Sequence, residues 1–343
     1  MCGIVGICGK QQDEWIELMN LPIVHRGPDD SGVFRDRDAN VALAMRRLAV
    51  IDLASGQQPI TTPSGRYTII FNGEIYNAPE LRTELEKKNV QFLTDHSDTE
   101  VVLRLFESEG ENLLRKLNGM FAFVIFDRDK KTLFGARDHA GIKPLHYLNQ
   151  NGFFAFASEL KSLLALPFLR REINMQSLFH YMSLMYVPGE ETIITGIKRL
   201  PAGHNFTYDI LKNSLKIKQW WKPNFTNIET GTGVDLVGKV RNNLEKAIKR
   251  WTLADVGIGC SLSGGLDSSA IVGLLAKSGM KLKTYSIGFS GKDEEYWNEL
   301  PRAAKVAKKW GTDHHELVLN PENLLDDLLE MVWHLDEPYA GGL

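Results

Sequence analysis

The chain has 343 residues, 43% of them hydrophobic, and its 40 basic and 43 acidic side chains leave a net charge of −3. This near balance argues against nucleic-acid binding, and no apolar run approaches the roughly 18 residues that a membrane-spanning helix needs. Length favours two domains, each large enough to bury a core. Three unpaired cysteines and the lack of a basic leader predict a cytoplasmic protein.

The N-terminal segment MCGIVGI is apolar and strand-like, with a cysteine at position 2. If Met1 is removed, Cys2 carries a free α-amino group whose pKa, near about 8, suits a general base. A thiol beside its own amine can serve as a nucleophile and base together. The alternative is a free cysteine buried in a first strand, and this segment alone leaves both interpretations open.

Two further segments combine strand patterns with polar residues. Residues 43–52 predict a strand in which Arg47 either faces solvent or holds a carboxylate. The sequence Asn72-Gly73, between the β-forming segments 67–71 and 74–76, predicts a β-hairpin with a type I′ turn. An asparagine side chain and an exposed glycine amide can also form an oxyanion hole, so the hairpin does not exclude catalysis.

Helices are expected at residues 79–88 and 98–109. The second begins with Ser97-Asp98-Thr99-Glu100, a capping-box pattern that gives Asp98 a structural role at the helix start. Further strands are expected at residues 120–126, 133–137 and 153–157. Many strands with few helices favour a stacked α+β architecture for this half.

The chain becomes turn-rich and polar between about residues 175 and 230, which places a domain boundary there. We therefore divide the sequence into an N-terminal domain over residues 1–205, a connecting strand and linker over 206–233, and a C-terminal part over 234–343.

The C-terminal part begins with a glycine-rich turn, Ser263-Gly264-Gly265-Leu266-Asp267-Ser268-Ser269, between an apolar run and a helix-like segment. Adjacent glycines and a helix N-terminus predict an anion-binding turn. No Lys-Ser or Lys-Thr pair follows, so it is not a Walker A loop. The alternative is a purely structural turn in which Asp267 or Ser268 caps the helix.

Strands at 282–289 and 315–319 alternate with helices at 300–310 and 324–333, which predicts a doubly wound parallel sheet. Ligands bind such sheets at the carboxyl ends of the strands, which places the Ser263 turn and Ile287 on the ligand side. Roughly 110 residues are few for a nucleotide-binding sheet with an acceptor site, so we expect this domain to be incomplete here.

Six segments occur in the order and spacing of one family: MCGIVGI at the terminus, HRGPDDSG at 25–32, FNGEIYN at 71–77, SDTE at 97–100, RDHAGIKPLHY at 137–147 and LSGGLDSS at 262–269. On these segments the chain resembles glutamine-dependent asparagine synthetases along essentially its whole length. The resemblance implies a glutamine amidotransferase domain with the αββα sandwich of N-terminal-nucleophile hydrolases. It further implies an ATP-pyrophosphatase-type α/β synthetase domain.

For the first domain, the resemblance implies that Cys2 attacks the side-chain amide of glutamine with its own amino group as base. Asn72 and the Gly73 amide would hold the oxyanion, Arg47 would bind the substrate carboxylate, and two acids would face its ammonium. The residues expected to bind glutamine are Arg47, Asn72, Gly73, Glu74 and Asp98.

For the second domain, the resemblance implies that the glycine-rich turn holds the pyrophosphate of ATP, with Asp267 reaching it through Mg²⁺. Backbone at Ser261 and Ile287 would contact adenine or ribose. The residues expected to bind ATP are Ser261, Ser263, Gly264, Gly265, Leu266, Asp267, Ser268 and Ile287. Ammonia would then displace AMP from an adenylated aspartate to give asparagine, and the family resemblance implies a homodimer.

Two other interpretations stay open. The chain could be a related AMP-forming amidotransferase that acts on a different carboxylate, such as a cell-wall or polysaccharide precursor. It could instead be a non-catalytic binding or regulatory protein that keeps the fold and retains Met1.

Position 261 is Ser where relatives often carry an aliphatic residue, and the late acidic and lysine residues of the synthetase site are missing. We therefore expect glutaminase activity without completed amide synthesis from this chain.

Overall fold

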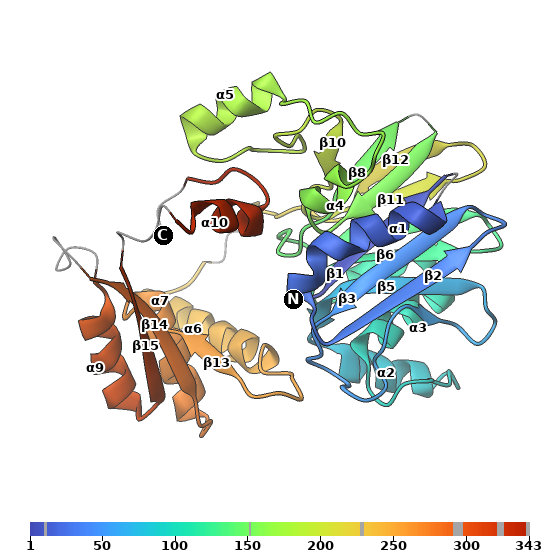
Figure 1. Cartoon of the computed structure of the whole chain (residues 1–343). Coiled ribbons are helices and arrows are strands. Elements are labelled where there is room, and N and C mark those ends of the chain that lie inside the picture. Colours follow the sequence, from blue (N-terminus) through green and yellow to red (C-terminus); the bar gives the residue numbers. More distant parts are fainter. Residues whose placement is uncertain (10–11, 151, 227–229, 291–297, 321–325, 341–343) are drawn as a thin grey trace. The chain divides into compact units, whose positions relative to one another are not determined.

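The computed structural model describes residues 1–343 except 10–11, 151, 227–229, 291–297, 321–325 and 341–343, and the chain forms two compact units (Figure 1). The first unit contains residues 1–224 and 334–343, and the second contains residues 225–333. The first unit extends past residue 205 because β11 (His204–Asp209) and β12 (Ser214–Gln219) complete one of its sheets. Among the described residues, no helix is long and apolar enough to cross a membrane.

Two six-stranded antiparallel sheets form the centre of the first unit. The first sheet has the order β10 (Ile197–Arg199), β8 (His146–Gln150), β9 (Phe153–Ala157), β1 (Gly3–Cys8), β3 (Val41–Arg47) and β2 (Asp30–Asp36). In the second sheet, β12 and β11 are followed by β7 (Thr132–Arg137), β6 (Gly119–Asp127), β5 (Tyr67–Ile75) and β4 (Ile60–Thr61).

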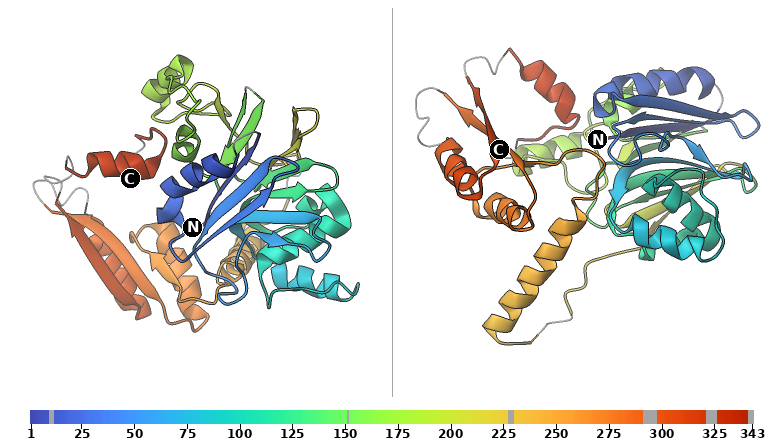
Figure 2. Two further views of the ribbon diagram at one scale, coloured as in Figure 1. Left: turned by 45° about the vertical axis from the view of Figure 1, so that its right-hand side comes forward. Right: turned by 90° about the horizontal axis from the view of Figure 1, so that it is seen from below.

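Helices cover the outer faces of both sheets, as the right-hand view of Figure 2 shows. Helices α1 (Gln12–Asn20) and α4 (Leu160–Leu164) pack on the first sheet, while α2 (Ala78–Glu86) and α3 (Asp98–Glu109) pack on the second. The remaining helices of this unit are η1 (Leu21–Arg26), η2 (Gly110–Arg115) and α5 (Met175–Leu184).

Three hydrophobic layers hold the first unit together. The layer between the sheets is rich in aromatic side chains, including Phe126, Phe156 and Phe206. The two outer layers lie between each sheet and its helices, with Ile16 in one and Val102 in the other. Strands buried on both faces explain the continuous apolar runs in the sequence. The αββα sandwich expected for an N-terminal-nucleophile hydrolase is therefore confirmed.

The second unit contains a parallel sheet of three strands in the order β13 (Gly259–Ser261), β14 (Lys283–Phe289) and β15 (Asp313–Leu319). Helices α7 (Leu266–Lys277) and α9 (Leu300–Trp310) pack against one another and against the sheet through small and aliphatic side chains. The expected alternation of strands and helices and the parallel sheet are thus confirmed.

In the sequence, helix α6 (Gly233–Arg250) precedes the strands of this sheet and helix α10 (Leu328–Leu335) follows them. The helix expected at residues 324–333 corresponds to α10, although its first two expected positions lie outside the described residues.

Candidate active site

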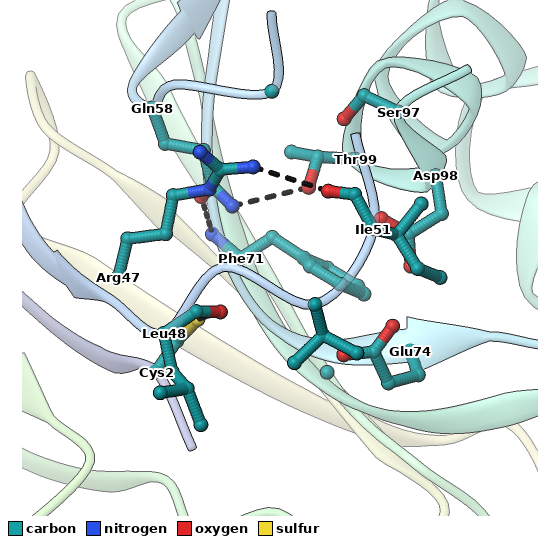
Figure 3. A pocket seen from close by; sticks show the side chains of 13 residues that line it. Cys2, Arg47, Leu48, Ile51, Gln58, Phe71, Glu74, Ser97, Asp98 and Thr99 are labelled. Atoms are coloured by element: carbon teal, nitrogen blue, oxygen red, sulfur yellow. Dashed lines mark hydrogen bonds between the residues drawn. The ribbon is translucent and has the colours of Figure 1, made fainter. Parts of the chain in front are cut away.

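A pocket in the first unit is lined by residues from both sheets and from the start of α3 (Figure 3). It brings together five residues that the sequence places in the glutamine site: Cys2, Arg47, Gly73, Glu74 and Asp98. They come from the ends of β1 and β3, from β5 and from the first turn of α3, so only the tertiary fold makes them neighbours. The other lining residues are Leu48, Val50, Ile51, Gly56, Gln58, Phe71, Ser97 and Thr99.

Cys2 directly precedes β1, a strand whose six residues are all buried. Because β1 lies between β9 and β3, the start of the chain is held inside the first sheet. The Cys2 thiol lies 3.7 Å from the carbonyl oxygen of Leu48, and burial raises the pKa of this thiol. A raised pKa keeps the sulfur protonated at neutral pH, so a nearby base is needed before it can attack a substrate.

The hairpin turn expected at Asn72-Gly73 is wrong, because both residues lie inside β5. This strand pairs with β6 over its whole length, from Tyr67 opposite Asp127 to Ile75 opposite Gly119. The presence of glycine at position 73 therefore needs an explanation other than a turn. A Cβ atom at Gly73 would lie 2.3 Å from the carbonyl oxygen of Met120, so the neighbouring backbone requires glycine.

Asn72 is fully buried, and neither its Oδ1 nor its Nδ2 has a hydrogen-bond partner within the described part of the chain. Ile70 packs in the layer between the sheets, which Cys2 also contacts. Side chains two residues apart share one face of a strand, so Asn72 faces this same layer. Unpaired buried polar groups cost about 1–3 kcal/mol each, and an unsatisfied amide here suits an oxyanion that arrives with the substrate.

Glu74 and Asp98 place two carboxyl groups in one pocket. Burial and the neighbouring Asp98 raise the pKa of Glu74, and burial raises the pKa of Asp98 as well. One Asp98 oxygen accepts a hydrogen bond of 2.9 Å from the backbone N–H of Ile75, which fixes its orientation. Two acids that are hard to ionise together favour the binding of a cation, because a positive charge between them stabilises both anions.

The capping box expected at the start of α3 does not form. Ser97 occupies the N-cap position but makes no capping hydrogen bond with its side chain. Glu100 is buried, and its carboxylate accepts hydrogen bonds from the backbone N–H groups of Leu93 and Thr94 instead. The helix start therefore places Asp98 at the pocket wall, while Glu100 anchors the preceding loop.

Arg47, the last residue of β3, is held by the loop that follows it. Its Nη2 donates to the carbonyl oxygens of Ile51 and Asp52, at 3.1 and 2.7 Å. The Asp52 carboxylate in turn accepts hydrogen bonds from the backbone N–H groups of Ser55 and His96. Burial opposes ionisation, but hydrogen bonds from Ser55 and His96 lower the pKa of Asp52 overall. The guanidinium is thus fixed at the pocket wall before any substrate binds.

Two further pocket residues, Gln58 and Thr99, were not among the site residues expected from the sequence, although Thr99 lies in the SDTE segment. The Gln58 Oε1 accepts from the backbone N–H of Phe71 at 2.7 Å, and its Nε2 donates to Thr99 Oγ1 at 3.1 Å (Figure 3). These bonds connect β5 to α3 and so fix the two elements that carry Glu74 and Asp98. Because the partners are 13 and 41 residues away, local sequence patterns could not identify Gln58.

In the second unit, the glycine-rich turn connects β13 to α7 as expected. Gly264 has a φ of +76°, and a Cβ atom there would lie 2.6 Å from the backbone of Arg302, so only glycine fits. The Ser263 Oγ accepts from the Gly265 N–H at 3.3 Å and lies 3.0 Å from the Ser268 Oγ. Gly265, and neither Asp267 nor Ser268, occupies the N-cap position of α7.

This turn fits a phosphate group, since it presents hydroxyl groups and a helix N-terminus of a twelve-residue helix at one place. Ser261 and Ile287 lie in the parallel strands β13 and β14, with Ser261 opposite Tyr285 and Ile287 two positions further along. The described residues contain no group of three or more His, Cys, Asp or Glu side chains suited to a metal ion. Asp267 lies in the first turn of α7 and could offer a carboxylate oxygen, the kind of ligand that Mg²⁺ prefers.

Comparisons with known proteins match two parts of the chain to two different domain families. A glutamine amidotransferase domain model matches residues 1–221, and an asparagine synthase model matches residues 239–342. The chain is 40% identical to asparagine synthetase [glutamine-hydrolyzing] 1 of Bacillus subtilis, over 99% of this chain and 54% of that protein. A protein provisionally named as the second such synthetase of Methanocaldococcus jannaschii is 34% identical, over 99% of this chain and 69% of that protein.

The chain spans about half the length of the two Bacillus subtilis relatives numbered 1 and 3, at 54% and 57%. Among solved structures, the glutamine phosphoribosylpyrophosphate amidotransferase of Bacillus subtilis in complex with ADP and GMP aligns over 92% of this chain and 81% of that chain. This alignment has a TM-score of 0.48 and 14% sequence identity. From the sequence matches, which extend over both halves, the chain belongs to the family of glutamine-hydrolysing asparagine synthetases.

Proposed function

We propose that the first unit hydrolyses glutamine at Cys2 and that the ammonia is used to form asparagine from aspartate at a synthetase site built on the second unit. The observation that carries this proposal is the pocket that unites Cys2, Arg47, Glu74 and Asp98 beside an unpaired, buried Asn72. A carboxylate, an ammonium and an amide are the three polar groups of glutamine, and the pocket offers a partner for each.

In the proposed hydrolysis, removal of Met1 frees the amino group of Cys2, which takes the thiol proton. The sulfur attacks the amide carbon, and Asn72 with the Gly73 N–H stabilises the resulting oxyanion. The C–N bond then breaks, the amino group returns its proton to the leaving ammonia, and a thioester remains on Cys2. Water hydrolyses the thioester to release glutamate and restore the thiol.

At the second site, the Ser263–Ser268 turn would hold the ATP phosphates, with Asp267 beside Mg²⁺ and the backbone at Ser261 and Ile287 against adenosine. When bound, ATP supplies the adenylyl group that activates the aspartate carboxylate, and ammonia then displaces AMP. The support from this chain is the turn itself, where Gly264 allows close approach of the backbone and α7 directs its N-terminus toward the ligand side.

The decisive experiment combines intact-mass measurement with glutamate release. We expect a mass that lacks Met1, and we expect Cys2→Ala to abolish glutamate release from glutamine. Cys260→Ala, which changes a half-buried cysteine of the second unit, is the matched control and should leave the rate unchanged. In a protein that carries the complete synthetase domain, Cys2→Ala should retain synthesis from added ammonia. Retained glutamate release in Cys2→Ala, or an N-terminus that keeps Met1, contradicts the proposal.

Three finer expectations follow from family membership. We propose Mg²⁺ as the ion that accompanies ATP, a cytoplasmic location, and a homodimer as the assembly. The oligomeric state is checked by light scattering, and the metal requirement by pyrophosphate release with and without added Mg²⁺.

A further inference from the structure

A buried carboxylate, that of Glu159, lies at the centre of a charged cluster behind the nucleophile. Its Oε1 lies 2.7 Å from Arg26 Nη1 and 3.1 Å from His25 Nε2, and its Oε2 lies 2.5 Å from Lys161 Nζ. Burial alone would raise the pKa of Glu159, but hydrogen bonds from Lys161 and Arg26 lower it. Glu159 is therefore an anion shared between basic side chains from two distant parts of the sequence.

This cluster reaches Cys2 directly. The Nε of Arg26 donates a hydrogen bond of 2.9 Å to the backbone carbonyl oxygen of Cys2, and the Arg26 side chain is buried. Next to Glu159, Ser158 is bonded to β1 in both directions: its Oγ accepts from the Ile4 N–H, and its N–H donates to the Ile4 oxygen. The position of the nucleophile thus depends on a guanidinium that Glu159 orients.

The cluster continues into the C-terminal segment, residues 334–340. The Asp336 carboxylate accepts the backbone N–H groups of Leu160 and Lys161, and it lies 3.4 Å from Lys161 Nζ. The ring of His334 meets the ring of His25 edge-on, with centroids 5.0 Å apart.

A second acid anchors the same segment. Glu337 pairs with Arg199 and lies 3.4 Å from His146 Nε2, and these partners belong to β10 and β8. Residues 334–340 form part of the first compact unit, yet they fall within the match to the asparagine synthase model and begin with the last two residues of α10. A piece of the synthetase sequence therefore completes the charge balance of the cluster behind the amidotransferase nucleophile.

We propose that Glu159 is a positioning residue for Cys2. We further propose that Asp336 makes this positioning depend on the packing of residues 334–340 against the rest of the first unit. Arg26 and Lys161 supply two positive charges, which Glu159 and Asp336 balance. Without the Asp336 carboxylate, Lys161 would pair more strongly with Glu159. The ion pair between Glu159 and Arg26 would then weaken, and Arg26 would lose its orientation and its hydrogen bond to the Cys2 carbonyl oxygen. The inference rests on the proposed glutaminase function, which it extends to the control of that site by the synthetase sequence.

The test uses the 343-residue chain with Glu159→Gln, Asp336→Asn and the double variant. Asp209→Asn is the matched control, since Asp209 pairs with Lys212 at the surface of the same unit. Two quantities are measured: kcat and KM for glutamate release, and the rate at which iodoacetamide alkylates Cys2, with Cys260 as internal reference. Thermal unfolding of each variant establishes that the first unit remains folded.

We expect each single variant to lower kcat about tenfold or more, because small displacements of a nucleophile carry rate losses of up to about 10²-fold. KM should stay within about twofold, and the loosened Cys2 should be alkylated faster while turnover falls. The double variant should have about the same kcat as the single variants, because the effects of two substitutions in one connected set of contacts are not additive.

Three results would overturn the inference: unchanged kcat and alkylation in both single variants, a change confined to KM, or additive effects in the double variant. If the parent chain releases no glutamate, the proposed function fails, but the Cys2 alkylation rates still decide whether Glu159 and Asp336 position the thiol.

Discussion

At the scale of single residues, the main feature of the pocket is a pair of acids that ionise with difficulty. Burial favours the protonated forms of Glu74 and Asp98 when no cation is present, and the neighbouring Asp98 raises the pKa of Glu74 further. The proposed substrate carries an ammonium group, and its binding would reverse this preference. Substrate binding and proton release are therefore coupled, and glutamine should bind more tightly as pH rises from mildly acidic to neutral.

We predict that Glu74→Gln stabilises the substrate-free protein at pH 8 but hardly at pH 5. A carboxyl group whose pKa is raised on folding contributes stability that is lost as pH rises through the folded pKa. The uncharged side chain of the Glu74→Gln variant does not titrate, so the variant avoids this loss of stability. Each pKa unit corresponds to about 1.4 kcal/mol, so a rise in Tm of a few degrees is expected. The same variant should raise KM for glutamine about tenfold or more.

Thermal melts at both pH values check this prediction, with Glu111→Gln as the control. Glu111 is an exposed residue that pairs with Lys218, so its variant should show no such pH dependence. A destabilisation by Glu74→Gln of equal size at pH 5 and pH 8 would contradict the assignment of a raised pKa.

At the scale of elements, strand β5 and the loop after β3 decide the shape of the pocket. Gly73 lies against β6 so closely that a methyl group would overlap the Met120 carbonyl oxygen. We predict that Gly73→Ala destabilises the first unit by about 1–3 kcal/mol, the usual effect of overpacking, and lowers glutaminase turnover.

Denaturant unfolding measures this effect, and Gly238→Ala in helix α6 is the control. No atom lies within 4 Å of a Cβ atom built at Gly238, so alanine should stabilise that helix by about 0.5–1 kcal/mol. Equal stability changes in the two variants would show that the β5–β6 contact is not as close as described.

The loop that carries Arg47 gives a second prediction at this scale. Asp52→Ala removes the carboxylate that holds Ser55 and His96, so Arg47 loses its fixed carbonyl partners and KM for glutamine should rise about tenfold. Because hydrogen bonds lower the pKa of Asp52, its stabilising effect is present at neutral pH and is lost as pH falls.

The unfolding free energies of Asp52→Ala and the parent chain should therefore differ at pH 7, and the difference should shrink only as pH falls below about 3.9, the ordinary pKa of an aspartate. Asp209→Ala, which removes a surface carboxylate, should leave KM unchanged. An unaltered KM in Asp52→Ala would mean that Arg47 is held without the loop.

At the scale of the whole molecule, the two proposed sites lie in separate compact units. We predict that Ser263→Ala and Asp267→Asn weaken binding of ATP with Mg²⁺ about tenfold, the equivalent of one lost hydrogen bond or charge contact, and leave glutamate release unchanged. Titration calorimetry and the glutaminase assay measure the two effects. If the variants lost ATP binding and glutamate release together, the turn would be needed for the folding of the first unit, and the assignment of a separate nucleotide site would be contradicted.

Elements with strong local signals could be predicted from the sequence alone. Helix α3, the strands β6, β14 and β15, helix α9 and the glycine-rich turn all follow patterns of apolar spacing or turn chemistry within about a dozen residues. The family was also readable, because its motifs are short, ordered and specific. The resemblance based on those motifs identifies Cys2, Arg47, Glu74 and Asp98 as site residues, although Arg47 lies outside the motifs and no local pattern marks the four as neighbours.

Contacts between distant residues decided the rest. Asn72-Gly73 satisfies the local rules for a hairpin turn, yet β5 pairs with β6 over its whole length, so the chain does not turn at these residues. Glu100 satisfies the capping-box pattern, yet the backbone of residues 93–94 binds its carboxylate. In each case a local preference worth about 1 kcal/mol gave way to a longer ladder or a more buried partner. Sequence thus determined the elements and the chemistry available, whereas tertiary structure alone decided which side chains meet, because burial and long-range hydrogen bonds outweigh local propensity.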